Sequence, residues 1–493
     1  MKVLRSLFLG LLVPAAIAAQ TQESIQRAAA SITAEDMLHR IGVIAHDSMM
    51  GRDTPSPGLD MTAEYIAREF QRFGLKPGGD EGTFLQRYEI RQTSLNIAAS
   101  EIRLGDGTTW RVPEDFVVRG GAASERISGP AVVLDGRSGS LDVLEQIEKG
   151  SILFLVMTQG PGVRQLYSAL ESIEASAVVL VGQPHNDQSW NRMAARQGRP
   201  QRQVGSGEQG TILMEVHDRA LRPVLSWHGY DLDTVQADGD RMFTVTHLDG
   251  LDMTIDLQYD VAPTLTAPNT VGILEGSDPE LKNEYLVFSG HMDHVGIRTP
   301  VEGDSIANGA DDDASGTIAV VELAEAFSKL DPRPKRSMIF VAVSGEEKGL
   351  WGSEFFVENP PIPVEQMVAN FNADMVGRNW TDTIVVIGKE HSDLGETMNR
   401  VNGEHPELGM TAIDDIWPEE NFYQRSDHYN FAQRGVPILF FFNGTHEDYH
   451  GVNDEVEKID GDKASRITQL MFYLGLEVAN APEKPKWKEE TIP

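Results

Sequence analysis

Histidine and carboxylate side chains follow four apolar runs that we predict to be strands, close to the point where each run ends. They are His291 and Asp293 after residues 285–289, Glu346 and Glu347 after 338–343, Asp374 after 368–373, and His450 after 436–442. In open α/β sheets, ligands bind outside the carboxyl ends of the strands. We therefore expect these side chains to gather at one edge of a sheet.

Three consecutive aspartates, Asp311, Asp312 and Asp313, lie directly before a predicted helix. Taken alone, they could be a helix N-cap with charges that favour the helix dipole. Glu346 and Glu347 alone could be a pair of solvated loop carboxylates. Their joint placement with the histidines at successive strand ends favours a metal site instead. Four other histidines are expected to be exposed or locally hydrogen-bonded: His294, His391, His405 and His446.

Imidazole nitrogens and carboxylate oxygens are the ligands that borderline and hard divalent cations prefer. The chain has no cysteine, so any metal site must use His, Asp and Glu. Two histidines with three or more carboxylates are too many for one tetrahedral zinc. They fit two cations that share a bridging carboxylate, which bind a hydroxide between them and polarise a carbonyl.

The elements around these residues alternate between strand and helix patterns from residue 269 onward. Helices are predicted over 318–330 and 463–479, and a further strand over 384–387. The run 338–343 contains no polar residue, as expected for a strand buried on both faces. This alternation predicts an α/β fold with a mostly parallel central sheet flanked by helices. Near the N-terminus, Thr33 can cap a helix over 34–45.

The residue pattern changes between residues 122 and 261. Short runs typical of β-strands appear there, such as 131–134, 151–156 and 177–181. A polar stretch, 183–210, interrupts them. We interpret 122–261 as an inserted β-rich module, so that the main domain consists of 19–121 and 262–493.

The first eighteen residues are predicted to be a secretory signal peptide. Lys2 and Arg5 precede the apolar run 7–19, and Ala16-Ile17-Ala18 offers a small-residue cleavage site. The protein is therefore expected to be exported, to the periplasm or the exterior. No later run of about 18 apolar residues occurs, so no stable membrane insertion is expected after cleavage.

Composition excludes several classes of protein. Lys and Arg total 42 against 75 Asp and Glu, which gives a net charge of −33. Phosphate neutralisation needs clustered Lys and Arg, so nucleic acid is not an expected partner. We find no Gly-rich phosphate loop after a strand and no convincing serine nucleophile elbow.

Five motifs, in this order and spacing, closely resemble the M28 family of zinc peptidases. They are Ser289–Asp293, Gly309–Gly316, Ser344–Ser353, Asn372–Gly377 and Tyr449-His450. The family contains aminopeptidases and glutamate carboxypeptidases with two zinc ions. The insert resembles a protease-associated (PA) domain.

The resemblance implies a role for each residue of these motifs. His291 and Asp374 would hold one zinc, Glu347 and His450 the other, and Asp312 would bridge them, giving two zinc ions per chain. Glu346 would be the general base, and Tyr449 would donate to the oxyanion. Asp293, Asp313 and Asp427 would support the ligands, and the peptide bond between Asp312 and Asp313 would be cis.

The implied function is that of an exported two-zinc exopeptidase, foremost an aminopeptidase that acts on peptides with a free amino terminus. A carboxypeptidase or dipeptidase is the alternative, and it would need a cation such as Arg425 or Arg378 for the substrate's terminal carboxylate. A glutaminyl cyclase or a non-catalytic receptor ectodomain is less favoured, because all five ligand positions are filled.

Overall fold

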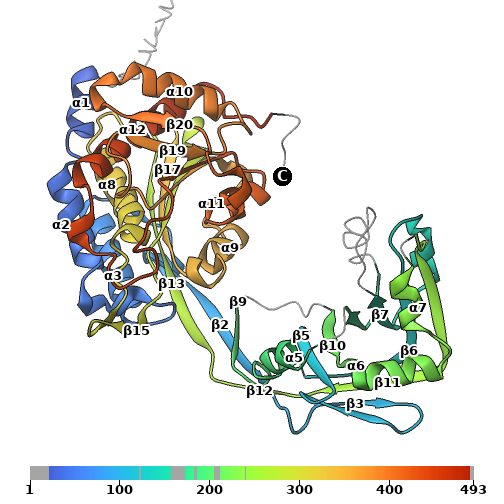
Figure 1. Cartoon of the computed structure of the whole chain (residues 1–493). Coiled ribbons are helices and arrows are strands. Elements are labelled where there is room, and N and C mark those ends of the chain that lie inside the picture. The colour runs from blue at the N-terminus through green and yellow to red at the C-terminus, as the bar shows by residue number, and fades with distance from the viewer. Residues whose placement is uncertain are drawn as a thin grey trace, which may run out of the picture. The chain divides into compact units, whose positions relative to one another are not determined.

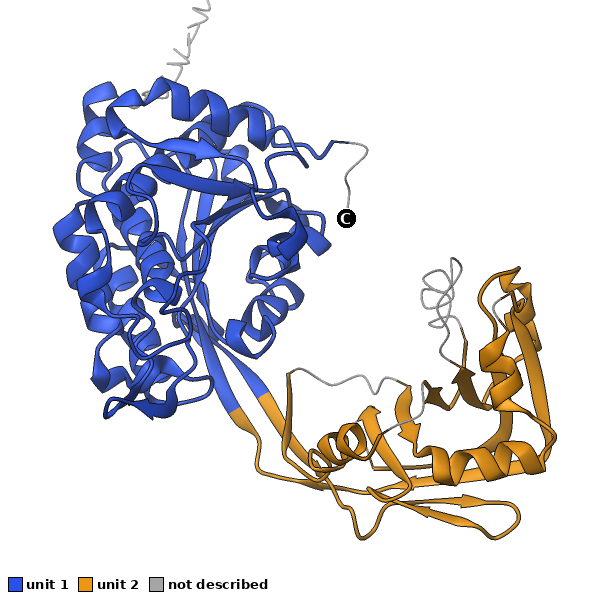
Figure 2. Cartoon of the chain, in the orientation of Figure 1, with its two compact units in different colours: residues 1–89, 266–493 blue, residues 90–265 orange. Residues whose placement is uncertain are grey.

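The computed structural model describes residues 21–121, 124–156, 173–182, 186–204, 211–238 and 240–488. The predicted signal peptide, residues 1–18, lies outside this part of the chain, as do 183–185 and 205–210 of the polar stretch. The chain divides into two compact units (Figure 2). Unit 1 comprises 1–89 and 266–493, and unit 2 comprises 90–265.

Unit 1 is built on a mixed sheet in which the strands follow the order β13-β17-β14-β18-β21-β19-β20. Their bounds are β13 Leu265–Leu274, β14 Tyr285–His291, β17 Ser337–Val343, β18 Met367–Asp374, β19 Thr383–Ile387, β20 Thr411–Ile413 and β21 Ile438–Phe442. The four strands β17, β14, β18 and β21 are mutually parallel. β13 and β19 run antiparallel to their neighbours β17 and β21. Because β17, β14, β18 and β21 run the same way, their carboxyl ends open onto the same edge.

Helices cover both faces of this sheet (Figure 1). Those on one side are α1 Gln22–Ala29, α2 Ala34–Ile44, α3 Pro57–Arg72, α8 Gly316–Ser328 and α12 Gly461–Asn480, and those on the other are α9 Trp351–Glu358 and α11 His428–Gln433. A further helix is α10 Leu394–Glu404. Thr33 caps α2 as expected, accepting a hydrogen bond from Asp36 N at 3.1 Å. With helices on both faces, β17 is buried at every residue, which explains its wholly apolar sequence after Ser337.

The core between sheet and helices is rich in phenylalanine. Phe288 of β14 stacks on Phe340 of β17 at 5.4 Å between ring centroids, and Phe327 of α8 meets Phe472 of α12 at 4.6 Å. Phe288 also meets Phe327 at 5.6 Å, so α8 packs against β14. The loops at the carboxyl ends of the strands are thereby held on a rigid base.

Unit 2 has an eight-stranded sheet of its own, in the order β4-β3-β11-β6-β7-β8-β10-β5. The bounds are β3 Glu101–Leu104, β4 Thr109–Arg111, β5 Phe116–Gly120, β6 Glu125–Asp135, β7 Ile152–Val156, β8 Ala177–Val181, β10 Ile212–Val216 and β11 Thr244–Leu257, with helices α5 Asp187–Ala194, α6 Asp218–Trp227 and α7 Leu232–Ala237. Two shorter strands, β9 Gln201–Val204 and β12 Tyr259–Val261, pair with β2 Leu85–Leu95 and so belong to the same 11-stranded sheet as β13.

Unit 2 begins at Ile90, earlier than residue 122, where the sequence predicts the insert to begin. The reason is strand pairing: β3 pairs with β11, and β5 pairs with β10. Residues 101–120 therefore share a sheet with the later part of the insert. Among all the residues described, no helix is both long and apolar enough to span a membrane.

Candidate metal centre

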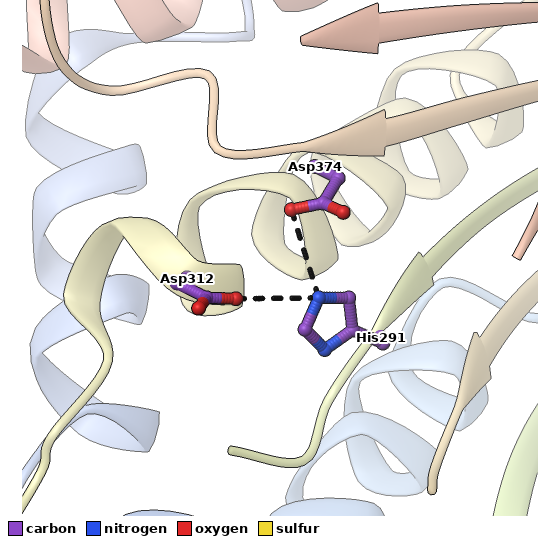
Figure 3. Close-up of side chains that lie close together, drawn as sticks. All are labelled: His291, Asp312 and Asp374. Atoms are coloured by element: carbon purple, nitrogen blue, oxygen red, sulfur yellow. Dashed lines mark ion pairs between the residues drawn. The ribbon is translucent and has the colours of Figure 1, made fainter. Parts of the chain in front are cut away.

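A first cluster of possible ligands forms where β14 and β18 end. His291 is the last residue of β14 and Asp374 the last of β18, while Asp312 comes from the loop before α8 (Figure 3). His291 Nε2 lies 3.4 Å from Asp312 Oδ1 and 3.6 Å from Asp374 Oδ1. All three residues are buried. The donor atoms of the three lie within 4.8 Å of one another, which is close enough for one ion.

A second cluster shares Asp312 with the first. His450 Nε2 lies 3.3 Å from Asp312 Oδ2 and 3.1 Å from Glu347 Oε2. His294 Nδ1 approaches the same two carboxylates, at 3.6 Å from Asp312 Oδ2 and 3.0 Å from Glu347 Oε1. Asp312 thus presents one carboxylate oxygen to each cluster. This is the arrangement that a bridging ligand requires.

His294 departs from its expected place. The sequence predicts an exposed or locally hydrogen-bonded side chain, whereas its ring is fully buried beside Asp312 and Glu347. The strand β14 ends at His291, so its next few residues turn into the same edge. The signal that could have found His294 is its position three residues after His291 in the same loop.

The donor atoms fit a cation. Asp312 Oδ2, Glu347 Oε1 and both ring nitrogens of His294 are buried and form no hydrogen bond of ordinary geometry with the described residues. Burying a carboxylate without a partner is costly. A divalent ion would satisfy these atoms, since imidazole and carboxylate donors suit zinc.

Asp293 orients His291. The Nδ1 atom of His291 faces the Asp293 carbonyl oxygen at 3.2 Å and its Oδ1 at 3.8 Å, which turns Nε2 toward Asp312 and Asp374. Asp293 is itself held by Thr54 Oγ1, which donates to Oδ2 at 2.9 Å. Its Oδ1 accepts a hydrogen bond from Glu346 N at 3.3 Å. One carboxylate therefore connects the imidazole to the predicted base.

Asp313 joins three segments of the site. Its carboxylate accepts hydrogen bonds from His291 N at 3.0 Å, Gly316 N at 2.9 Å and Met375 N at 3.1 Å. The peptide bond between Asp312 and Asp313 is cis, as the resemblance implies. Burial, followed by the charge of Asp374, raises the pKa of Asp313 well above its ordinary value.

Two residues that the sequence analysis did not single out hold the loop of Asp312. Asp454 accepts hydrogen bonds from Asp311 N and Asp312 N, both at 3.1 Å. Arg52 is completely buried and donates to Met292 O at 2.8 Å and to Gly309 O at 3.0 Å. A lone arginine and a lone aspartate carry no local signal of such a role, because their partners are far away in the sequence.

Ser344 holds the turn that carries Glu346 and Glu347 through the contacts of its hydroxyl group. Its Oγ donates to Pro268 O at 2.6 Å and lies 2.9 Å from the hydroxyl of Tyr88. Gly345 follows with a φ of +73°, and a Cβ there would lie 2.7 Å from that hydroxyl. The sequence analysis also missed Tyr88, which packs under the turn and leaves room only for glycine.

The two adjacent glutamates differ in their electrostatics. Burial raises the pKa of Glu346 well above its ordinary value, and the charges of Asp427 and Asp374 raise it further. Burial also acts on Glu347, but the His294 and His450 imidazoles outweigh it and hold its pKa below the ordinary value. The surroundings thus favour the charged form of Glu347 and the protonated form of Glu346.

The remaining predicted site residues lie close by. Asp427, at the start of α11, is fully buried, and burial raises its pKa to about 7. Tyr449 is 36% exposed and stacks on His450 at 3.8 Å between ring centroids. A cavity opens onto the first cluster, including the shared Asp312. Its lining residues are His291, Asp312, Glu346, Asp374, Met375, Phe422, Arg425, Ser426, Phe440, Phe442, Thr445 and Tyr449.

A family model and several known proteins are similar to the part of the chain that carries the site. The family model of peptidase family M28 matches residues 269–475, which contain every predicted ligand. A "probable zinc metalloprotease" of Pyrenophora teres f. teres is 27% identical over 283 residues, covering 48% of this chain and 57% of that protein. The aminopeptidase YwaD of Bacillus subtilis is 27% identical over 235 residues, covering 45% and 47%. The chain thus spans about half the length of the curated relatives it matches.

Two solved structures to which the chain is similar are aminopeptidases by title. The aminopeptidase from Aneurinibacillus sp. strain AM-1 has a TM-score of 0.49 at 17% identity, covering 95% of this chain and 98% of that one. The zinc aminopeptidase BSAP from Bacillus subtilis has a TM-score of 0.47 at 16% identity, covering 93% and 96%.

Proposed function

Residues 269–475 belong to peptidase family M28, and from this premise we propose that the protein is a two-zinc exopeptidase, an aminopeptidase that cleaves peptides at a free amino end. The observation that carries the proposal is the carboxylate of Asp312. It is shared by two clusters of buried donors, with His291 on one oxygen and His450 on the other.

The ligands follow from the two clusters. His291, Asp312 and Asp374 would hold one zinc, and Asp312, Glu347 and His450 the other. When bound, the two ions supply Lewis-acid polarisation of the scissile carbonyl and lower the pKa of an attacking water. His294 lies as close to Glu347 as His450 does. The geometry of the second cluster therefore offers two imidazoles where the resemblance assigns one.

Glu346 performs the proton transfers. Its raised pKa makes its carboxylate a base able to take a proton from the attacking water. The same proton then passes from Glu346 to the nitrogen of the leaving amine, so that the carboxylate is regenerated. Asp293 supports both partners, since it faces His291 Nδ1 and accepts from Glu346 N. The hydroxyl of Tyr449 donates to the oxygen of the scissile carbonyl as charge develops on it.

Two further parts of the proposal concern the rest of the chain. Residues 1–18 act as a signal peptide, so the enzyme works outside the cytosol, in the periplasm or beyond. Unit 2 is the PA-like lobe, with a sheet of its own in support. The expected substrates are short peptides.

Elemental analysis and a substrate panel test the proposal together. Purified protein should contain close to two zinc ions per chain, and a chelator should abolish cleavage of aminoacyl p-nitroanilides. N-acetylation of a cleaved peptide should reduce the rate by orders of magnitude. Equal cleavage of blocked and free peptides would favour the carboxypeptidase alternative, and full activity with one ion or none would refute the two-metal site.

Two variants decide which imidazole completes the second cluster. His450→Ala should lower the zinc content toward one ion per chain, whereas His294→Ala should leave it near two. The reverse result would assign the ligand to His294.

A further inference from the structure

We propose that Arg425 selects substrates that carry a carboxylate next to the scissile bond, either on the side chain of the amino-terminal residue or at the carboxyl end of a dipeptide. This inference rests on the peptidase function proposed above. It names the class of substrate that the same site would bind.

Arg425 lies in the wall of the cavity that contains His291, Glu346 and Asp374. Its chain neighbour Ser426 donates a hydrogen bond to Asp374 Oδ2 at 2.9 Å, which anchors this segment beside the first cluster. Among the residues that line the cavity, Arg425 is the only lysine or arginine. A substrate bound at the clusters therefore meets one permanent positive charge from a side chain.

The guanidinium group of Arg425 contacts an aromatic ring and forms only a weak ion pair. It lies over the ring of Phe422, 4.6 Å from the ring centroid. Stacking on an aromatic face leaves the planar fork of N–H donors pointing outward along its edge. Its polar contact within the described residues is with Glu420, at 3.5 Å, and both side chains are about half exposed. An ion pair of that length and exposure contributes little.

The surroundings strengthen a bond to an anion. The same wall carries the apolar side chains of Met375, Phe440 and Phe442. A charge-assisted hydrogen bond is stronger where the local dielectric is low. The chain as a whole has a net charge of −33, so other parts of its surface repel a carboxylate. Selection of an acidic group thus needs a local cation, and Arg425 supplies it.

Arg378, the other arginine considered from the sequence, does not compete for this role. It is 13% exposed and donates to Asp448 at 3.1 Å. It is also not among the residues that line the cavity. The alternative reading of the cavity is an apolar pocket in which Arg425 is a solvated rim residue, and that reading predicts a preference for leucine or phenylalanine.

The test compares kcat/KM on p-nitroanilides of glutamate, glutamine and leucine, and on Leu-Leu against Leu-Leu amide. Arg425→Ala should lower kcat/KM for the substrates with the recognised carboxylate by about 10–100-fold, because hydrogen bonds to charged groups are lost. The uncharged substrates should change little. Arg425→Lys should recover part of the loss, since it keeps the charge without the fork. The glutamate arm reports a side-chain carboxylate, and the Leu-Leu arm a terminal one.

Arg434→Ala is the matched control. Arg434 is equally exposed, at 46%, and pairs with Glu358 at 3.0 Å, away from the cavity. It should leave every ratio unchanged. Calorimetry of glutamate and glutamine, or of Leu-Leu and its amide, gives a readout apart from turnover, in which Arg425→Ala should weaken only the charged ligand of the pair.

The outcomes separate the two proposals. Cleavage that a chelator abolishes, with the same substrate ratios in wild type and Arg425→Ala, would overturn the role of Arg425 and leave the peptidase intact. No cleavage of any peptide by the zinc-loaded protein would instead overturn the function itself.

Discussion

The two units bury charge in different ways. In unit 2, the fully buried carboxylate of Asp135 accepts a hydrogen bond from Tyr230 at 2.6 Å and pairs with Arg241. In unit 1, the sheet edge buries several carboxylates whose neighbours are other carboxylates and imidazoles. Within the described residues, the buried side-chain atoms without a hydrogen bond include Asp311, Asp312, Glu347 and Asp427 oxygens in unit 1, but only the Ser151 hydroxyl in unit 2.

The paired aspartate of unit 2 contributes to stability, whereas the carboxylates at the sheet edge of unit 1 point to a function. An unpaired buried carboxylate destabilises a fold unless a ligand compensates it. Unit 2 pairs its aspartate internally, so that site is complete as a structural element. The edge of unit 1 gathers buried imidazole and carboxylate donors that a divalent cation could satisfy, as the proposed metal centre requires.

Metal removal should have the largest effect. Dialysis against a chelator should abolish peptide cleavage and lower the midpoint of thermal unfolding, because four or more buried charges at the edge of unit 1 lose their partner. Readdition of zinc should restore both. Asp135 and its partners need no ion, so spectroscopic probes of unit 2 should show no zinc-dependent change. If the metal-free protein kept its activity, the buried carboxylates of unit 1 would not differ from those of unit 2 by needing an ion.

Glu346→Gln and Glu347→Gln should separate base from ligand. The first should lower kcat by about 10²–10⁴-fold while both ions remain bound, because only the proton acceptor is lost. The second removes a charged donor, so zinc content itself should fall. Activity assays and elemental analysis on the same samples measure the two effects. Near-normal turnover in metal-loaded Glu346→Gln would remove Glu346 from its role.

Asp135→Ala should affect stability and not catalysis. The change leaves Arg241 and Tyr230 without their shared acceptor, and loss of one partner of a buried pair costs about 3–5 kcal/mol. Urea unfolding should show the loss, while kcat/KM on a short substrate stays at the wild-type value below the transition. A catalytic defect in folded Asp135→Ala would mean that the two kinds of buried charge are not distinct.

Tyr88→Phe should have a smaller effect on catalysis. It removes one hydrogen bond to Ser344, worth about 1 kcal/mol, and loosens the turn before Glu346. We expect a several-fold fall in kcat, unchanged KM and a shifted pH profile, because the base and not the substrate site is displaced. Tyr230→Phe, which also removes a buried hydroxyl contact but lies in unit 2, should leave the pH profile unchanged.

His428 should make a measurable contribution to the pH dependence of stability. It is fully buried, and burial lowers its pKa to about 3, from an ordinary 6.5. Between these values the unfolded chain binds a proton that the folded chain does not, so His428 destabilises the fold as pH falls from 6.5 toward 3. His428→Gln should flatten the fall of the unfolding midpoint over this range. His39→Gln, at an exposed position, should leave the slope as it is.

Much of unit 1 could be predicted because its signals are local. A strand expected over 338–343 is β17, Ser337–Val343, and a helix expected over 463–479 is α12, Gly461–Asn480. Apolar periodicity and the absence of polar residues fix such elements within a residue or two. The polar residues that follow each strand could be placed at one edge for the same reason, although their roles as ligands remain predictions.

The tertiary structure alone decided the rest. The burial of His294 and the contacts of Arg52, Asp454 and Tyr88 join segments that lie far apart in the chain, as when Arg52 donates to Met292 and Gly309. The start of unit 2 at residue 90 likewise depends on pairing between β3 and β11. The sequence by itself determined most of the residues that could bind a metal, though not His294, and the elements that carry them. Which of those residues lie beside one another depended on long-range packing, because no local pattern records the partner of a lone buried side chain.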